Sequence, residues 1–163
     1  MAEHDPIDGW EPPGANARRE ILERSRSVAI VGASSNASRA SNFVATYLLS
    51  PSADFDVFLV NPREDEILGQ LVYPSLEALP VVPDIVDVFR RSDDLPEIAD
   101  EAIAIGARVF WVQLGLWSAE AARQCVGAGI DVVMDRCLKI EHARFNGGLH
   151  LAGFDTGVIS SKR

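Results

Sequence analysis

The sequence predicts an α/β fold in which helices enclose a doubly wound, mainly parallel sheet of five strands. Short apolar runs rich in Val, Ile and Phe recur along the chain, and their nearly continuous apolarity is typical of strands buried on both faces of a parallel sheet. Segments with helical periodicity separate most of these runs, as in successive β-α units. The five runs are residues 28–31, 57–60, 85–89, 109–112 and 132–134.

The clearest helical segment spans residues 95–105, where apolar residues are spaced three or four apart. Asp93 or Asp94 can cap its start, because a short carboxylate accepts hydrogen bonds from the first backbone N–H groups. Pro96 suits the first turn, and Gly106 suits the position just past the end. The sequence therefore predicts both ends of this helix.

Three further helices are predicted with less regular patterns. One spans residues 16–25, before the first strand. Ser41 is expected to cap the helix that follows the first strand, and Ser118 the helix over residues 119–126. The connection over residues 61–84 is rich in proline and leaves room only for a short helix at residues 75–79.

The chain divides into three parts on this pattern. Residues 1–14 hold three prolines and two glycines before any periodicity begins, so we expect an extended arm and ordered structure from about residue 15. Residues 15–145 form one domain, a usual length for a single core. No structure is assigned to the tail over residues 146–163.

The composition excludes several functions. A formal net charge of −9 disfavours a nucleic-acid binder, because the phosphate backbone requires a concentrated basic face. The start of the chain has neither a basic segment nor an apolar run, so we expect no secretion signal, no membrane association and a cytoplasmic location. The spacing of Cys125 and Cys137 fits neither a CxxC pair nor a zinc site, which predicts free thiols.

Ligands of open parallel sheets bind beyond the carboxyl ends of the strands, near the point where strand order reverses. The segments at that edge are residues 32–41, 61–63, 90–92, 113–117 and 135–137. The first of them holds Gly32, four serines and Arg39 and then enters a helix, whose N-terminal N–H groups suit an anion. It lacks two glycines of the dinucleotide G-x-G-x-x-G pattern, so a plain turn is the alternative.

The second strand ends in Val60, Asn61 and Pro62, without the acidic residue that binds the NAD ribose. This argues against NAD. Arg63 can pair with a ribose phosphate, which both NADP and coenzyme A carry, or be an ordinary surface arginine.

Arg90, Gln113 and Gly115 follow the third and fourth strands and bring polar groups to the same edge. Arg90 can equally pair with surface acids. Cys137 follows the fifth strand but has no evident base near it in the sequence, so we expect a buried, inert thiol and no catalysis.

Four segments carry a resemblance to the stand-alone CoA-binding protein family: SVAIVGASSNASRASNFVATYLL, FDVFLVNPREDEILGQLVYPSLEALP, DIVDVFRRSDDLPEIADEAIAIGARVFWVQLG and DVVMDRCLKIEHAR. The resemblance spans roughly residues 20–145. The family is similar to the nucleotide-binding domain of the succinyl-CoA synthetase alpha subunit. The resemblance implies a Rossmann-type three-layer sandwich and a coenzyme A site at the carboxyl edge of the sheet. It implies no ligase activity, because the phosphorylated histidine of that enzyme lies in a further domain.

Carried over by position, the binding residues of the family fall on Gly32, Ser34, Arg39, Ser41, Val60, Asn61 and Pro62. Ala40 stands where the family often has proline. The resemblance implies a small-molecule nucleotide ligand, coenzyme A or an acyl-CoA, held by a carrier, sensor or accessory protein. Two alternatives stay open: an NADP-dependent oxidoreductase, and an interaction module that has lost its ligand. The sequence identifies no protein partner.

Overall fold

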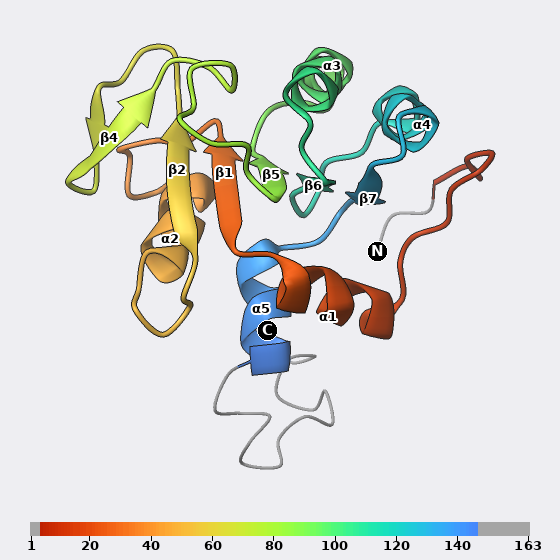
Figure 1. Ribbon diagram of the computed structural model, residues 1–163, viewed down its shortest axis with the longest axis horizontal. Helices are drawn as coiled ribbons and strands as arrows, with labels where there is room; N and C mark the ends of the chain where they lie inside the picture. Colours follow the sequence, from red (N-terminus) through yellow and green to blue (C-terminus); the bar gives the residue numbers. More distant parts are fainter. Residues whose placement is uncertain (1–3, 147–163) are drawn as a thin grey trace.

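The computed structural model describes residues 4–146 as a three-layer α/β fold, with helices on both faces of one twisted sheet (Figure 1). The strands are β1 (Ser27–Val31), β2 (Asp56–Val60), β3 (Glu66–Ile67), β4 (Gln70–Tyr73), β5 (Ile85–Val88), β6 (Val109–Val112) and β7 (Asp131–Val133). The helices are α1 (Ala15–Arg24), α2 (Ala40–Leu48), α3 (Leu95–Ile105), α4 (Ala119–Gly127) and α5 (Leu138–Asn146), and a 3₁₀ turn, Ser92–Asp94, precedes α3. No described helix has the length and apolarity needed to span a membrane.

The sheet confirms the doubly wound, mainly parallel fold. Its order is β3-β4-β2-β1-β5-β6-β7, and every neighbouring pair is parallel except β3 and β4. The five predicted strands form the continuous parallel part β2-β1-β5-β6-β7. The strand count of five was too low, because two further strands extend the sheet beyond β2.

The two additional strands form a hairpin within the connection that sequence reasoning treated as a weak helical crossover. Leu68 and Gly69 both have positive φ angles, 53° and 74°, which is the geometry of a tight hairpin turn. The turn pairs Ile67 with Gln70. The helix expected at residues 75–79 does not form, and two successive turns take its place.

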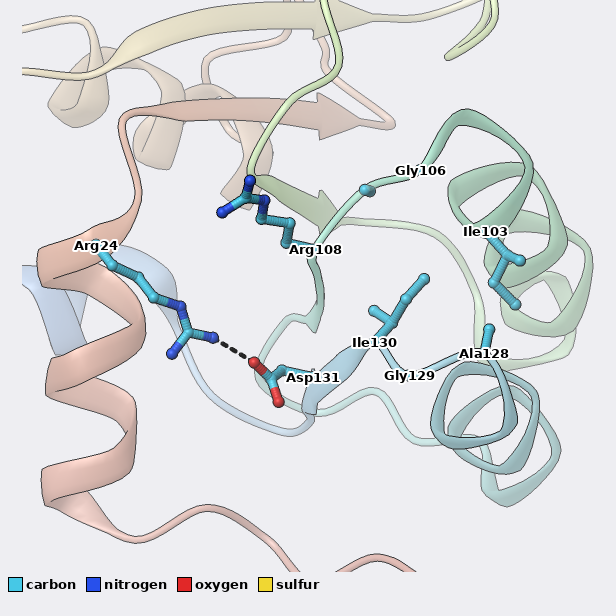
Figure 2. A pocket seen from close by; sticks show the side chains of 9 residues that line it. Arg24, Ile103, Gly106, Arg108, Ala128, Gly129, Ile130 and Asp131 are labelled. Atoms are coloured by element: carbon cyan, nitrogen blue, oxygen red, sulfur yellow. Dashed lines mark hydrogen bonds and ion pairs between the residues drawn. The ribbon is translucent and has the colours of Figure 1, made fainter.

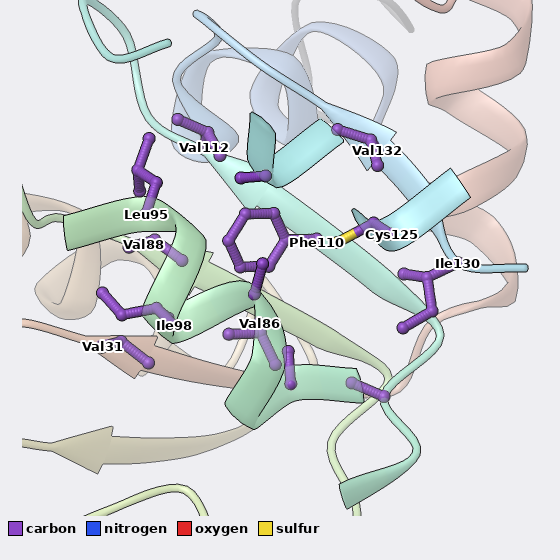
Figure 3. Packing of buried hydrophobic residues seen from close by; sticks show 14 of the residues in the cluster. Val31, Val86, Val88, Leu95, Ile98, Phe110, Val112, Cys125, Ile130 and Val132 are labelled. Carbon is purple, nitrogen blue, oxygen red and sulfur yellow. The ribbon is translucent and has the colours of Figure 1, made fainter. Parts of the chain in front are cut away.

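Side chains alternate between the two faces of the sheet, and each face has its own core. Ala29 and Val31 of β1 belong to the core beneath α3 and α4, whereas Val28 and Ile30 belong to the core beneath α1, α2 and α5. Figure 3 shows the first core, in which Phe110 of β6 is surrounded by aliphatic residues of β1, β5, α3 and α4. Continuous burial along β1, β5 and β6 explains why their sequences are apolar at every position except Ser27 and Asp87.

The observed ends of α3 and α4 match the predicted caps better than the start of α2 does. Gly106 is the left-handed residue that ends α3, and the Ser118 hydroxyl accepts a hydrogen bond from the N–H of Ala121. Asp94 occupies the N-cap position of α3, but its carboxylate makes no capping hydrogen bond and pairs with Arg90 instead.

Ser41 does not cap α2, contrary to the prediction. The helix begins at Ala40, with Arg39 as N-cap, and Ser41 is buried in its first turn. The side chain of Asn36 closes the preceding loop by accepting from both the N–H and the hydroxyl of Ser38. The chain therefore reaches helical geometry before Ser41.

The segment before α1 packs against the domain, although ordered structure was expected only from about Ala15. Ile7 is buried in the core beneath α3 and α4, and its carbonyl accepts a hydrogen bond from the N–H of Trp10. The Trp10 indole donates to the carbonyl of Val132 in β7. One apolar residue in a proline-rich segment thus anchors this part of the chain. The C-terminal tail predicted from residue 146 lies, beyond Asn146, outside the described residues.

Asp87 breaks the apolar character of β5. It is completely buried between Ile30 and Trp111 of the neighbouring strands, and neither carboxylate oxygen has a hydrogen-bond partner. Burial disfavours the charged form and raises the pKa of Asp87 well above its ordinary value of 3.8. The folded protein therefore binds a proton at Asp87 at pH values where the unfolded chain has released it.

We expect the free energy of unfolding to fall as pH rises from the ordinary aspartate pKa to the raised one. The loss should approach about 1.4 kcal/mol per pH unit within that window, and Asp87→Asn should remove it, because the amide cannot ionise. Urea unfolding of both proteins between pH 5 and pH 9 measures this effect. Asp93→Asn, which changes an exposed carboxylate, is the control. The expectation would be contradicted if the difference in unfolding free energy between the wild type and Asp87→Asn stayed constant with pH.

Candidate functional site

The strand order reverses at β1, which makes the carboxyl ends of β1 and β5 the topological switch point of the sheet. From β1 the chain passes through α2 to β2 on one side, and later returns to β5 on the other side. The loops after β1 and β5 lead to α2 and α3 on opposite faces of the sheet, and open parallel sheets have their ligand crevice at such a point. Sequence reasoning expected the ligand at this edge.

Gly32 lies directly against the end of β5 and the loop that follows it. Its φ is +89°, and a Cβ at this position would lie 2.6 Å from the carbonyl oxygen of Phe89 and 3.0 Å from Cδ of Arg90. The N–H groups of Gly32 and Ala33 both donate to the carbonyl of Val60 at the end of β2, over 3.1 and 3.2 Å. Only glycine therefore lets the loop after β1 join β2 while it passes directly over β5.

Asn61 holds the other side of the crevice. Its side-chain amide donates to the carbonyl of Ala33 over 2.7 Å, and its Oδ1 accepts from the N–H of Arg63 over 2.7 Å. Pro62 and Arg63 are exposed beside it. Asn61 thus positions the loop after β1 and the turn after β2, and an acidic residue here could not donate the first of these bonds.

The serine-rich loop is organised mainly by internal hydrogen bonds. The Ser34 hydroxyl accepts from the N–H of Asn36, and the Ser34 carbonyl accepts from the side chain of Asn42 in α2. Glu64, which sequence reasoning did not single out, accepts from the N–H of Ser35 over 3.1 Å. Most backbone N–H groups of the loop therefore already have acceptors, and the groups left for an anion are chiefly those at the start of α2.

Arg39 and Arg63 are the exposed cations at this part of the edge, and neither forms a salt bridge within residues 4–146. Arg39 is the N-cap residue of α2, where the partial positive charge of the helix end adds to that of the guanidinium. Arg90 differs, because it pairs with Asp94 over 3.3 Å. This edge thus combines two guanidinium groups that form no salt bridge among residues 4–146 with the Glu64 carboxylate, on a chain whose net charge is −9.

Gln113 and Gly115 lie on the β6 side of the edge. Gln113 is buried, and its Oε1 accepts the N–H of Leu138, so that side chain holds the start of α5. Gly115, at φ +88°, donates its N–H to Asp135 over 2.7 Å. These two hydrogen bonds join the loops after β6 and β7. The partners Asp135 and Leu138 lie 20 and 25 residues away in the sequence, which is why no local pattern revealed them.

A groove of about 690 Å³ opens beside these two loops. It is lined by His4, Pro12, Leu114, Gly115, Trp117, Met134, Asp135, Arg136, Cys137, Ile140, Glu141 and Arg144, and is called the α5 groove below. Gly115 belongs both to this lining and to the predicted site residues. The candidate site consequently has two parts: the crevice at β1 and β5, and the α5 groove at β6 and β7.

A second cavity, of about 370 Å³, lies at the opposite edge of the sheet (Figure 2). It is lined by Gly106 and Arg108 before β6 and by Gly129 and Asp131 around the start of β7. Its Asp131 carboxylate forms an ion pair with Arg24, and both side chains are about half exposed. A solvated surface pair at the amino ends of strands lacks the converging backbone N–H groups of the crevice.

A family model described as a CoA binding domain matches residues 26–143. The chain belongs to this CoA-binding family. The protein YneT of Bacillus subtilis (strain 168) is 41% identical over 125 residues, which are 77% of this chain and 91% of YneT. A hypothetical protein from Pyrococcus horikoshii OT3 has a similar structure, with a TM-score of 0.77 and 38% identity over 89% of this chain and 99% of that one.

A more distant structural neighbour shows the fold alone. The apo form of a dinucleotide-forming acetyl-coenzyme A synthetase from Ca. Korarchaeum cryptofilum is 24% identical, with a TM-score of 0.60. The likeness covers 65% of this chain and 25% of the synthetase. The CoA-binding fold therefore also occurs as part of a larger protein.

Backbone and amide hydrogen bonds bring together three of the predicted site residues, Gly32, Val60 and Asn61. Ser34, Arg39, Pro62, Arg63 and Arg90 surround this centre on the adjoining loops. Ser41 and Gln113 differ from these surrounding residues, because both are buried and Gln113 already accepts a hydrogen bond. Their direct contact with a ligand stays a prediction, as do the roles of the other residues.

Gly32→Ala should destabilise the fold by about 1–3 kcal/mol, because alanine adds both the strain of a positive φ and a contact with the Phe89 carbonyl. Gly69→Ala is the matched control: its φ is +74°, but a Cβ there meets nothing within 4 Å. Chemical denaturation of the two variants separates the steric effect from the φ effect. Equal losses of stability would show that the close approach to β5 is not needed.

Proposed function

We propose that the protein binds coenzyme A or an acyl-CoA at the carboxyl edge of the sheet and acts as a carrier, sensor or accessory protein. The observation that carries the proposal is the loop after β1, which passes over β5 at Gly32 and enters α2 with Arg39 at the N-cap. Backbone N–H groups, the helix dipole and a guanidinium then favour phosphate at one place. Membership of the CoA-binding family supports coenzyme A as the source of that phosphate.

The ligand needs local positive charge because the chain as a whole repels anions. Arg39 at the start of α2 and Arg63 in the turn after β2 supply it, and neither forms a salt bridge within the described part of the chain. Arg90 contributes less positive charge, since it is paired with the Asp94 carboxylate. The proposal assigns no reaction to the protein.

An NADP-dependent oxidoreductase is the alternative that the same arginines favour, because NADP also carries a ribose phosphate. A thermal melt distinguishes the two ligands. At about 100 times its dissociation constant, a ligand should stabilise the protein by about 2.7 kcal/mol, which is several degrees for a domain of this size. We expect the shift with coenzyme A and none with NADP. The reverse result would favour the oxidoreductase, and no shift with either would favour an interaction module without a ligand.

Arg39→Ala should weaken the binding of coenzyme A about tenfold to hundredfold, because charge-assisted hydrogen bonds to phosphate are lost. Isothermal titration calorimetry measures the change, and the melting temperature without ligand should stay close to that of the wild type. Arg19→Ala, which removes an exposed arginine from α1, is the charge-matched control. Unchanged affinity in folded Arg39→Ala would place the phosphate elsewhere.

A further inference from the structure

The α5 groove is formed by four separate segments of the chain. The segment before α1 contributes His4, whose ring stacks on Trp117 with the centroids 3.7 Å apart. The loop after β6, the loop after β7 and helix α5 complete the walls. Its volume of about 690 Å³ is within the usual range of about 300–1,000 Å³ for small-molecule pockets.

Large apolar side chains are exposed at this groove. Leu114 is 62% exposed in the loop after β6, and Ile140 is 46% exposed on α5. Both line the groove, together with Trp117 and Met134. Exposure of two large aliphatic residues at one concave surface is unfavourable in water and is typical of a site that an apolar group covers.

The two acids of the lining are already hydrogen-bonded, and one of them, Glu141, is also paired with a cation. Glu141 is buried and pairs with Arg18 of α1, and Asp135 accepts the N–H of Gly115. Arg136 forms no salt bridge among residues 4–146. The groove therefore combines an apolar lining with a cation that can donate to a carbonyl oxygen.

The α5 groove lies at the same edge of the sheet as the proposed coenzyme A site. Gly115 forms part of its wall and follows β6, which is the neighbour of β5 at the crevice. The groove at β6 and β7 lies about two interstrand spacings, about 10 Å, from the crevice at β1 and β5. The pantetheine arm is an extended chain with two amide groups and spans that distance. Its sulfur end then reaches the α5 groove when the phosphates lie at Gly32.

We propose that the α5 groove binds the acyl chain of an acyl-CoA thioester, between Leu114 and Ile140. The inference rests on the proposed function and names its ligand class: thioesters with an apolar acyl chain are bound in preference to free coenzyme A. The acyl chain covers the exposed aliphatic side chains. The guanidinium of Arg136, which belongs to the lining, is the donor for the thioester carbonyl.

Titration calorimetry with coenzyme A and its acetyl, butyryl, hexanoyl and octanoyl thioesters tests this inference on the full chain. The dissociation constant should fall about fourfold per added methylene until the groove is full, which corresponds to about 0.8 kcal/mol per buried methylene. Equal affinity across the series, with coenzyme A itself bound, would overturn the acyl groove and leave the proposed function standing. No binding of any member would overturn the proposed function.

Two substitutions locate the effect. Leu114→Ser and Ile140→Ser should each reduce the ratio of octanoyl-CoA to coenzyme A affinity severalfold. Leu71→Ser is the matched control, since Leu71 is 65% exposed on β4 and lies outside the groove. An equal reduction in Leu71→Ser would overturn the assignment. The assignment would also be overturned if Leu114→Ser changed the oligomeric state but left the ratio of octanoyl-CoA to coenzyme A affinity unchanged. A second copy of the chain would then be what covers the groove.

Cys137 was expected to be buried, but it lines the groove and is partly exposed, so it provides a direct readout. Cys125 serves as the internal control: it is buried, and burial together with Asp100 raises the pKa of its thiol to about 12. Octanoyl-CoA should slow alkylation of Cys137 by iodoacetamide more than coenzyme A does at equal saturation. Equal protection by the two ligands would place the acyl chain outside the groove.

Discussion

The contact of Gly32 with the Phe89 carbonyl determines how the carboxyl edge of this sheet is built. A loop that leaves β1 must join β2 through the Val60 carbonyl and still pass over β5, and the space allows this only without a Cβ. The same turn brings the chain to Arg39 and the start of α2. The position of the proposed phosphate site therefore follows from a backbone constraint at Gly32. Arg39 then supplies positive charge at that position.

Charge at this edge is decided locally. The chain carries −9, yet Arg39 and Arg63 have no acidic partner among residues 4–146, while Arg90 is paired with Asp94. Within a few ångströms, individual charges and N–H groups outweigh the net charge, because solvent and salt screen distant charges over about 10 Å. An acidic protein can thus hold a polyanionic ligand at one edge. Glu64, bonded to Ser35, limits how much of the loop is available to it.

The parallel part of the sheet could be predicted because burial on both faces makes each strand apolar along its whole length. The hairpin of β3 and β4 could not, since Leu68 adopts a positive φ that the sequence does not signal. Gln113 was correctly placed at the carboxyl edge, but its hydrogen bond to Leu138 depends on a contact across 25 residues. Ser41 was misassigned as a cap because Asn36 and Ser38 close the loop earlier. Predictions from local patterns held where burial decides the structure and failed where side chains bond across loops.

Mapping of backbone amide shifts during titration with coenzyme A tests the central claim, that the ligand lies at the carboxyl edge of the sheet. The account predicts the largest shifts at Gly32, Asn61 and Gly115. Gly106 and Gly129, which line the cavity at the opposite edge (Figure 2), should stay unchanged. Saturable shifts centred on Gly106 and Gly129, with Gly32 unmoved, would contradict it.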